Sequence, residues 1–142
     1  MSVSPEFERG IAEFNQQQFY ACHDTLEAIW VDAEEVDKRF YQGILQVAVG
    51  CYHLSNDNLR GAIILLGEAV RRLCDYQPDY ESVDVEKLLA ESANLLQTLQ
   101  QLKPEQAKDF FKIIQKESGE SEADHNLVNL AAGCKLPYIN RV

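Results

Sequence analysis

Helix-breaking residues and alternating strand patterns are scarce in this sequence. Its 142 residues include only four prolines and seven glycines, and nowhere do β-branched residues alternate with polar ones over six positions, as a half-buried strand would. No uncharged apolar run approaches the ~20 residues that a membrane-spanning helix needs, and the segment from Met1 to Pro5 is unlike a signal peptide. We therefore expect an all-α protein with no sheet, located in the cytoplasm and outside the membrane.

Positive charge is also scarce. Lys and Arg number 13 against 23 Asp and Glu, which gives a net charge of −10. Such a field repels nucleic acid and anionic lipid, so neither is expected as a partner. The sequence leaves open which small molecule or protein binds and what the oligomeric state is.

Closely spaced cysteine pairs are absent. No C-x-x-C motif occurs, although the chain has four cysteines, at positions 22, 51, 74 and 134. Without a secretory signal, disulfides are not expected, and the spacing does not favour a zinc site. We expect the cysteines to be small, buried hydrophobic residues.

Helix signals follow one another along the whole chain. Ser4 and Pro5 are typical of an N-cap and a first helical position, and Asp84 is a good N-cap for a later helix. Hydrophobic residues recur at steps of three and four between the turns. The length fits one domain, so we expect residues 1–142 to form a single irregular bundle of about six or seven helices.

The segment 40–56 carries no charged residue, which predicts a helix enclosed on most sides. One side of it has Gln42, Gln46 and His53, beside a strip of Gly43 and Gly50 where another helix can approach closely. An unpaired buried amide or imidazole costs about 1–3 kcal/mol, so polar partners are expected for this side.

The preceding helix offers such partners. His23 and Glu27 are four residues apart and share a face, with Trp30 in the next turn, whereas Asp24 is expected to point toward solvent. A short link would fold the two helices into an antiparallel hairpin. We therefore expect the His23/Glu27 pair to lie near Gln42 and Gln46 in one buried polar cluster.

These motifs resemble a known family. The segments His23-Asp24-x-x-Glu27-x-x-Trp30 and Phe40-Tyr41-Gln42-Gly43-x-x-Gln46, followed by His53 and Asn58-x-x-Gly61-Ala62, are similar to the signature H-E-x-x-E-x-x-W, F-x-Q-G-x-x-Q and a later histidine of the prokaryotic domain-of-unknown-function family 309. The resemblance covers a core of about residues 12–85, which leaves C-terminal helices and a tail at 86–142. It implies a small multihelical domain, for which a metal-dependent hydrolase role has been suggested.

One position departs from the family pattern. Asp24 stands where the family usually has glutamate. A carboxylate on a side chain shorter by one methylene would be placed differently, which indicates a surface or capping position rather than a catalytic one.

Two functions fit these observations. The first is a non-enzymatic binding or interaction module whose polar cluster organises the core or holds a small ligand. The second is a metal-dependent hydrolase, in which His23, Glu27 and His53 ligate a divalent ion while Gln42 and Gln46 support the ligands. A divalent metal ion is the one cofactor suggested, and none is required. The candidate site residues are His23, Glu27, Trp30, Gln42, Gln46 and His53.

A third, less supported alternative is nucleophilic catalysis by Cys22 with His53, because an imidazolium beside a cysteine activates its thiolate. No turn in the sequence is typical of an oxyanion-stabilising site.

Overall fold

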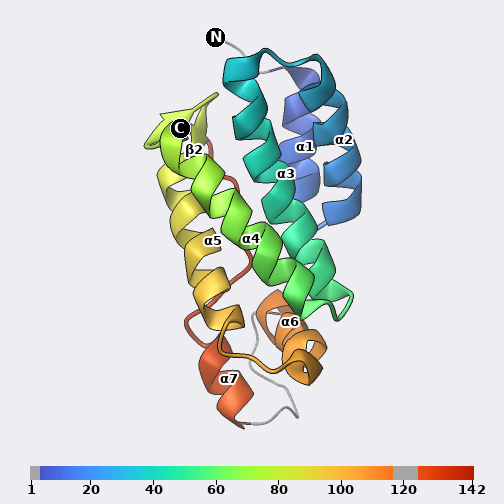
Figure 1. Cartoon of the computed structure of the whole chain (residues 1–142), viewed down its shortest axis with the longest axis vertical. Coiled ribbons are helices and arrows are strands. Elements are labelled where there is room, and N and C mark those ends of the chain that lie inside the picture. The colour runs from blue at the N-terminus through green and yellow to red at the C-terminus, as the bar shows by residue number, and fades with distance from the viewer. Residues whose placement is uncertain (1–3, 117–124) are drawn as a thin grey trace.

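The computed structural model describes residues 4–116 and 125–142, which form seven α-helices, two 3₁₀ turns and one small hairpin (Figure 1). The α-helices are α1 (Pro5–Asn15), α2 (Phe19–Asp32), α3 (Glu35–Ser55), α4 (Leu59–Leu73), α5 (Val85–Leu99), α6 (Ala107–Lys116) and α7 (His125–Ala131). The 3₁₀ turns are η1 (Cys74–Tyr76) and η2 (Pro104–Gln106).

Local capping accounts for where several helices begin. The Oγ atom of Ser4 accepts a hydrogen bond from the backbone N–H of Phe7, 3.2 Å away, and Pro5 occupies the first turn of α1. Asp84 caps α5 in the same way, accepting from the N–H of Lys87 at 3.0 Å. Both caps satisfy N–H groups that have no partner within the helix, as predicted.

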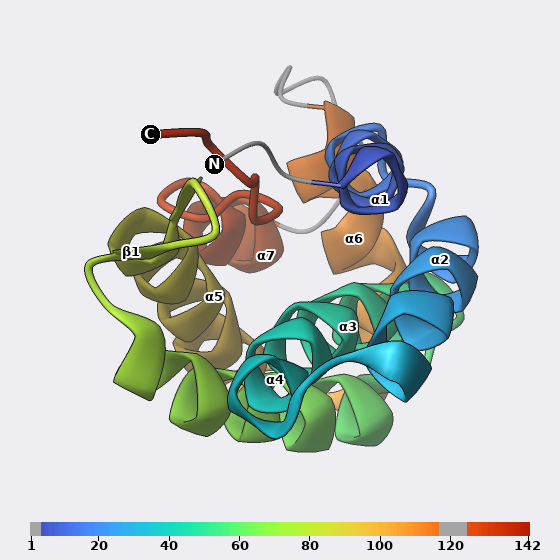
Figure 2. The ribbon, with the colours of Figure 1, turned by 90° about the horizontal axis from the view of Figure 1, so that it is seen from above.

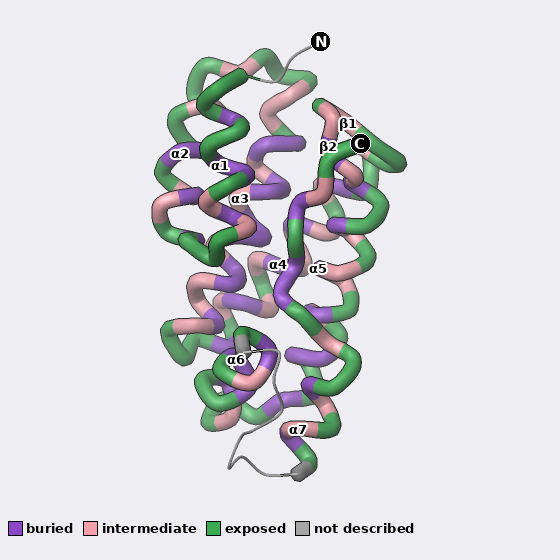
Figure 3. Tube along the Cα trace, turned by 180° about the vertical axis from the view of Figure 1, so that it is seen from behind, coloured by how far each residue is buried: buried purple, intermediate pink, exposed green. Residues whose placement is uncertain are grey.

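Helix α3 lies at the centre of the fold. Its most extensive contacts are with α4, followed by those with α2, and α6 also packs against it (Figures 1 and 2). An apolar stripe of α3 is fully buried and consists of Phe40, Ile44, Val47, Cys51 and Leu54. Figure 3 shows that buried positions in the other helices also lie on their inward sides. The lack of charge in this helix from residue 40 onward thus reflects neighbours on several sides.

The two interior glycines of α3 allow α4 to approach closely. A Cβ atom at Gly43 would lie 2.8 Å from Cγ and Cδ2 of Leu73, and one at Gly50 would lie 3.1 Å from Cγ of Leu66. Leu66 and Leu73 are both fully buried. The strip predicted from the glycine spacing is therefore the contact surface for α4.

The expectation of no sheet is wrong in one place. β1 (Asp79–Tyr80) and β2 (Val83–Asp84) form an antiparallel hairpin, and Val83 also bridges to Arg141 of the C-terminal tail. Glu81 and Ser82 between them have φ values of 50° and 61°, the conformation of a two-residue hairpin turn. Strands of two residues are too short to show a period-2 pattern, so alternation could not reveal them.

The cysteines are all free but differ in burial. Cys22 and Cys51 are fully buried, whereas Cys74 is exposed and Cys134 is half-buried. The expectation of four buried cysteines is therefore wrong for Cys74.

None of the helices in the described ranges combines the length and the apolar character needed to cross a membrane.

Candidate functional site

One edge of α2 carries an imidazole between two carboxylates. His23 Nδ1 lies 3.3 Å from Asp24 Oδ1, and His23 Nε2 lies 3.5 Å from Glu27 Oε2. The side chains are 32%, 64% and 56% exposed for His23, Asp24 and Glu27. The pairing of His23 with Glu27 follows from their i,i+4 spacing, as predicted, but it lies at the surface and not in a buried cluster.

These three side chains have the composition of a metal site. Their ligand atoms all lie within 4.8 Å of one another, and they are the one such group of His, Cys, Asp or Glu in the described part of the chain. Two atoms that each lie ~2.0–2.2 Å from one ion are at most ~4.4 Å apart. Because Asp24 lies at Nδ1 and Glu27 at Nε2 of the imidazole, one of these exposed carboxylates has to rotate toward the other ring nitrogen for all three residues to hold one ion. Imidazole nitrogen and carboxylate oxygen together suit Zn²⁺ and Mn²⁺.

The third member of the group differs from the sequence prediction. Asp24 is exposed, as expected, but its carboxylate joins the group, whereas the ring nitrogens of His53 do not. The amide Nδ2 of Asn58 lies 3.4 Å from His53 Nδ1. Helix periodicity placed Asp24 on another face, yet residues i and i+1 can both reach an atom beside the helix when their side chains turn toward each other.

His53 nevertheless lies near His23. Because α2 and α3 run antiparallel, the end of α3 lies beside the start of α2, and both histidines line one small cavity of about 130 Å³. The other residues that line it are Phe19, Tyr20, Val49 and Tyr52. The ring centroids of Tyr20 and Tyr52 are 5.4 Å apart, and Tyr20 is 58% exposed. An aromatic cavity therefore adjoins the His23 carboxylate group.

Gln46 has its partners on another helix. Its Nε2 donates to Glu68 Oε2 at 2.9 Å, and its Oε1 accepts from Arg72 Nη1 at 3.0 Å. Glu68 and Arg72 both lie on α4, which packs against the glycine strip beside Gln46. Gln42 is half-buried and makes no hydrogen bond to a described residue. The prediction that Gln42 and Gln46 face His23 and Glu27 in one buried cluster is therefore wrong.

Trp30 also lies outside any common site. The ammonium of Lys38 is 4.8 Å from the centroid of its indole ring, a cation–π contact across the α2–α3 turn. Its indole Nε1 is buried without a hydrogen-bond partner among the described residues. The structure therefore pairs His23 with Glu27, places His53 nearby, and gives Gln46 and Trp30 other partners.

The burial of Cys22 argues against its use as a nucleophile. Burial, together with the charge of Glu13, raises the pKa of its thiol to about 12. Its reactive thiolate form is therefore disfavoured at neutral pH.

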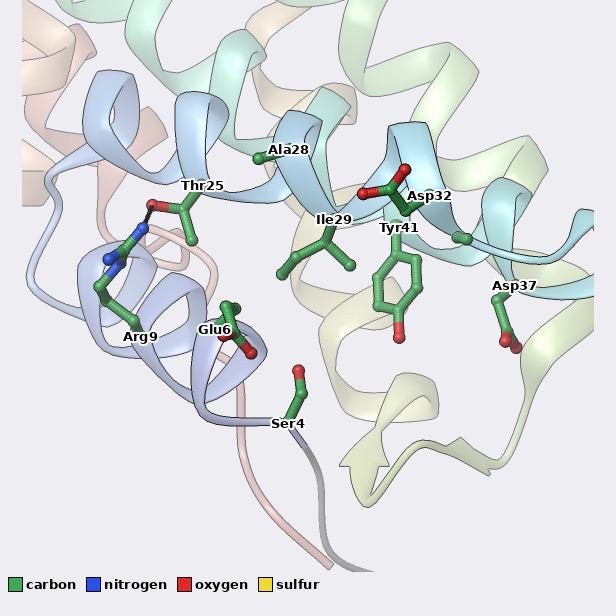
Figure 4. Close-up of a pocket in the computed structure, with 10 residues that line it drawn as sticks. Ser4, Glu6, Arg9, Thr25, Ala28, Ile29, Asp32, Asp37 and Tyr41 are labelled. Atoms are coloured by element: carbon green, nitrogen blue, oxygen red, sulfur yellow. Dashed lines mark hydrogen bonds between the residues drawn. The ribbon is translucent and has the colours of Figure 1, made fainter.

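A second, larger opening was not identified from the sequence. It is a cleft of about 410 Å³ between the first turn of α1 and the α2–α3 turn (Figure 4). The ring of Tyr41 packs in the core, and its hydroxyl reaches this cleft. The sequence gives only a weak indication of this cleft. The acidic residues that line it, Glu6, Asp32 and Asp37, lie on three different helices and so share no helix face.

The motif Asn58-x-x-Gly61 has a structural explanation. Asn58 Oδ1 accepts a hydrogen bond from the N–H of Gly61 at 2.9 Å and so caps α4. A Cβ atom at Gly61 would lie only 2.6 Å from Asn58 Nδ2. The same amide contacts His53, so this part of the motif positions the end of α3 against the start of α4.

Comparison with known proteins supports the resemblance inferred from the motifs. The family described as "Domain of unknown function (DUF309)" matches residues 7–65. "Uncharacterized protein YpuF" of Bacillus subtilis (strain 168) is 32% identical over 92 residues, which are 63% of this chain and 50% of that protein. The chain thus spans about half the length of this curated relative. No solved structure gives a significant match. The predicted resemblance to domain-of-unknown-function family 309 is thereby confirmed over residues 7–65, a segment that contains all six site residues proposed from the sequence.

Proposed function

We propose that this protein is a binding module in which His23, Asp24 and Glu27 hold a divalent cation. The observation that carries the proposal is the convergence of an imidazole and two carboxylates, with all ligand atoms within 4.8 Å of one another. Three protein ligands leave coordination positions open for water or for an exogenous ligand.

The neighbouring cavity supports a role in ligand binding. It is lined by the aromatic rings of Phe19, Tyr20 and Tyr52, together with Val49 and the two histidines. Its volume of about 130 Å³ is below the ~300–1,000 Å³ typical of sites that enclose a whole small molecule. The cavity therefore suits one apolar group of a ligand whose polar end is coordinated at His23.

The surface charge favours the same interpretation. The chain carries a net charge of −10, and each of the two carboxylates of the group is more than half exposed. A cation therefore reaches the site without first displacing a strong ion pair with Lys or Arg. The attraction to cations is a long-range effect of the whole chain, whereas the three ligands supply the local selectivity.

Calorimetric titration with Zn²⁺ tests the proposal, using protein purified without a metal-affinity tag and stripped with a chelator. We expect His23→Ala, Asp24→Asn and Glu27→Gln each to weaken Zn²⁺ binding by at least ~10-fold. Glu105→Gln is the matched control, because it removes one exposed carboxylate charge, in η2, that does not belong to the group. Equal affinities of Glu27→Gln and Glu105→Gln would contradict the proposal.

The second candidate function is a metal-dependent hydrolase, and the placement of His53 in the same cavity as His23 favours it. A divalent cation held at His23 would act as a Lewis acid and would lower the pKa of a water molecule bound to it. His53 would then exchange a proton with the reacting groups from across the cavity. In a hydrolysis assay with bis(p-nitrophenyl) phosphate, His53→Ala should abolish turnover and leave Zn²⁺ affinity unchanged. Absence of turnover in the Zn²⁺-loaded wild type would leave the binding module as the function.

A further inference from the structure

The cleft at the start of α1 is separate from the His23 group, because the residues that line it belong neither to that group nor to the aromatic cavity beside it. It opens where the first turn of α1 meets the turn between α2 and α3 (Figure 4). Its volume of about 410 Å³ is within the range of small-molecule sites. The polar residues that decide its chemistry are Ser4, Glu6, Arg9, Asp32, Asp37 and Tyr41.

Tyr41 places an unpartnered hydroxyl in this cleft. Its side chain is held by Phe7 and Phe40, with ring centroids 5.3 and 5.5 Å away, and the residue is only 9% exposed. Figure 4 shows the hydroxyl pointing away from α3 into the space between Ser4 and Asp37. It makes no hydrogen bond to any residue in the described ranges and opens to the cleft. A donor group of a ligand in the cleft can therefore reach it.

The cleft has an excess of negative charge. Glu6, Asp32 and Asp37 line it, against one cation, Arg9. The guanidinium of Arg9 is directed to the hydroxyl of Thr25 at 3.5 Å. Asp37 accepts a hydrogen bond from the hydroxyl of Tyr80, which orients its carboxylate.

Burial and nearby carboxylates keep the phenol of Tyr41 protonated. Burial, followed by the charges of Glu81 and Asp37, raises the pKa of Tyr41 to about 12. The hydroxyl is therefore neutral at physiological pH, and its oxygen is free to accept a hydrogen bond from a cationic donor.

We infer that this cleft binds a small organic cation with more than one amino group, whose ammonium groups pair with Asp32 and Asp37 and donate a hydrogen bond to the hydroxyl of Tyr41. A single metal ion fits less well, because in the described ranges no three ligand atoms converge in the cleft. Separated carboxylates instead match the separated charges of a diamine. An ammonium group also has three N–H donors, enough to meet a carboxylate and the phenol oxygen together.

The test is a calorimetric titration with 1,4-diaminobutane at low ionic strength, with butylamine as the monoamine control. We expect saturable binding of the diamine, at least ~10-fold tighter than that of butylamine, because the second ammonium adds a charge-assisted hydrogen bond. Comparable affinities for the two amines would overturn the inference, and so would displacement of the diamine by an equal concentration of Mg²⁺.

Variants then locate the binding. Tyr41→Phe keeps the ring in the core and removes only the hydroxyl, and Asp32→Asn changes an exposed residue whose loss does not threaten folding. Each should weaken diamine binding by at least ~10-fold, whereas Glu105→Gln, which removes the same charge far from the cleft, should not. His23→Ala should also leave it unchanged, which separates this site from the proposed cation site. If Glu105→Gln weakened diamine binding as much as Asp32→Asn does, the diamine would be held only by the general negative charge of the protein. That result would overturn the inference.

Discussion

Gln46 of α3 and Arg72 of α4 are joined by a hydrogen bond of 3.0 Å from the guanidinium to the amide oxygen. The amide nitrogen of Gln46 donates in turn to Glu68, which lies one helical turn before Arg72. Both hydrogen-bonding groups of the buried amide are thus satisfied by one neighbouring helix. This arrangement explains how a polar side chain is accommodated in the uncharged part of α3, and it assigns Gln46 to helix packing.

Substitution of Gln46 should therefore lower the free energy of unfolding. Gln46→Ala removes two hydrogen bonds, but Glu68 and Arg72 are partly exposed and still pair with each other at 3.8 Å. We expect a loss of about 1–1.5 kcal/mol in the free energy of unfolding, measured in urea. Gln42→Ala, on the same helix, should change it by less than ~0.5 kcal/mol. Equal urea midpoints for the two variants would show that the contacts of Gln46 contribute nothing.

Two glycine-to-alanine substitutions should have opposite signs. A Cβ atom at Gly43 would lie 2.8 Å from two carbon atoms of the buried Leu73, so α3 and α4 would have to move apart. We expect Gly43→Ala to destabilise the fold by about 1–3 kcal/mol.

The control is Gly67→Ala, in the interior of α4, where an added Cβ meets no atom within 4 Å. This change should stabilise the fold by up to ~1 kcal/mol through helix propensity. Thermal denaturation of both variants measures the difference, and stabilisation by Gly43→Ala would contradict the close approach of α4.

The acidic residues beside His23 should matter little for folding. Glu27 was expected to be buried, so its loss would have been costly, but its side chain is 56% exposed and that of Asp24 is 64% exposed. Glu27→Ala and Asp24→Ala should each change the free energy of unfolding by less than ~0.5 kcal/mol in metal-free protein. A much larger loss in Glu27→Ala alone would mean that its carboxylate is enclosed in solution.

Stability should fall at alkaline pH in part because of Tyr41. Its pKa is raised from 10.0 to about 12 in the folded protein, so the folded state keeps this proton at pH values where the unfolded chain has lost it. The stabilisation from Tyr41 is therefore complete below pH 10 and is lost as the pH rises toward 12. Tyr41→Phe should show a shallower fall in urea midpoint above pH 10 than the wild type, whereas Tyr138→Phe, at an exposed position, should fall like the wild type.

Helix positions and the close approach at Gly43 and Gly50 could be predicted because they follow from local rules. A capping serine such as Ser4 or an aspartate such as Asp84 acts within four residues, and helical periodicity places a glycine pair on one face whatever packs there. The pairing of His23 with Glu27 is local for the same reason. By contrast, Gln46 is paired with residues 22 and 26 positions away, and periodicity shows on which side of α3 it lies but not which helix covers that side.

The amino-acid sequence by itself determined an acidic, helical chain, its N-caps, the enclosed central helix and the family resemblance, since each depends on composition or on spacing within a single helix. Only the tertiary structure decided that α4 rather than α2 meets Gln46, that Asp24 rather than His53 completes the group at His23, and that Tyr41 presents its hydroxyl to an acidic cleft. The first and third outcomes depend on how separate helices pack against one another, and the second depends also on the side-chain conformations of two neighbouring residues, neither of which is fixed by spacing within a single helix.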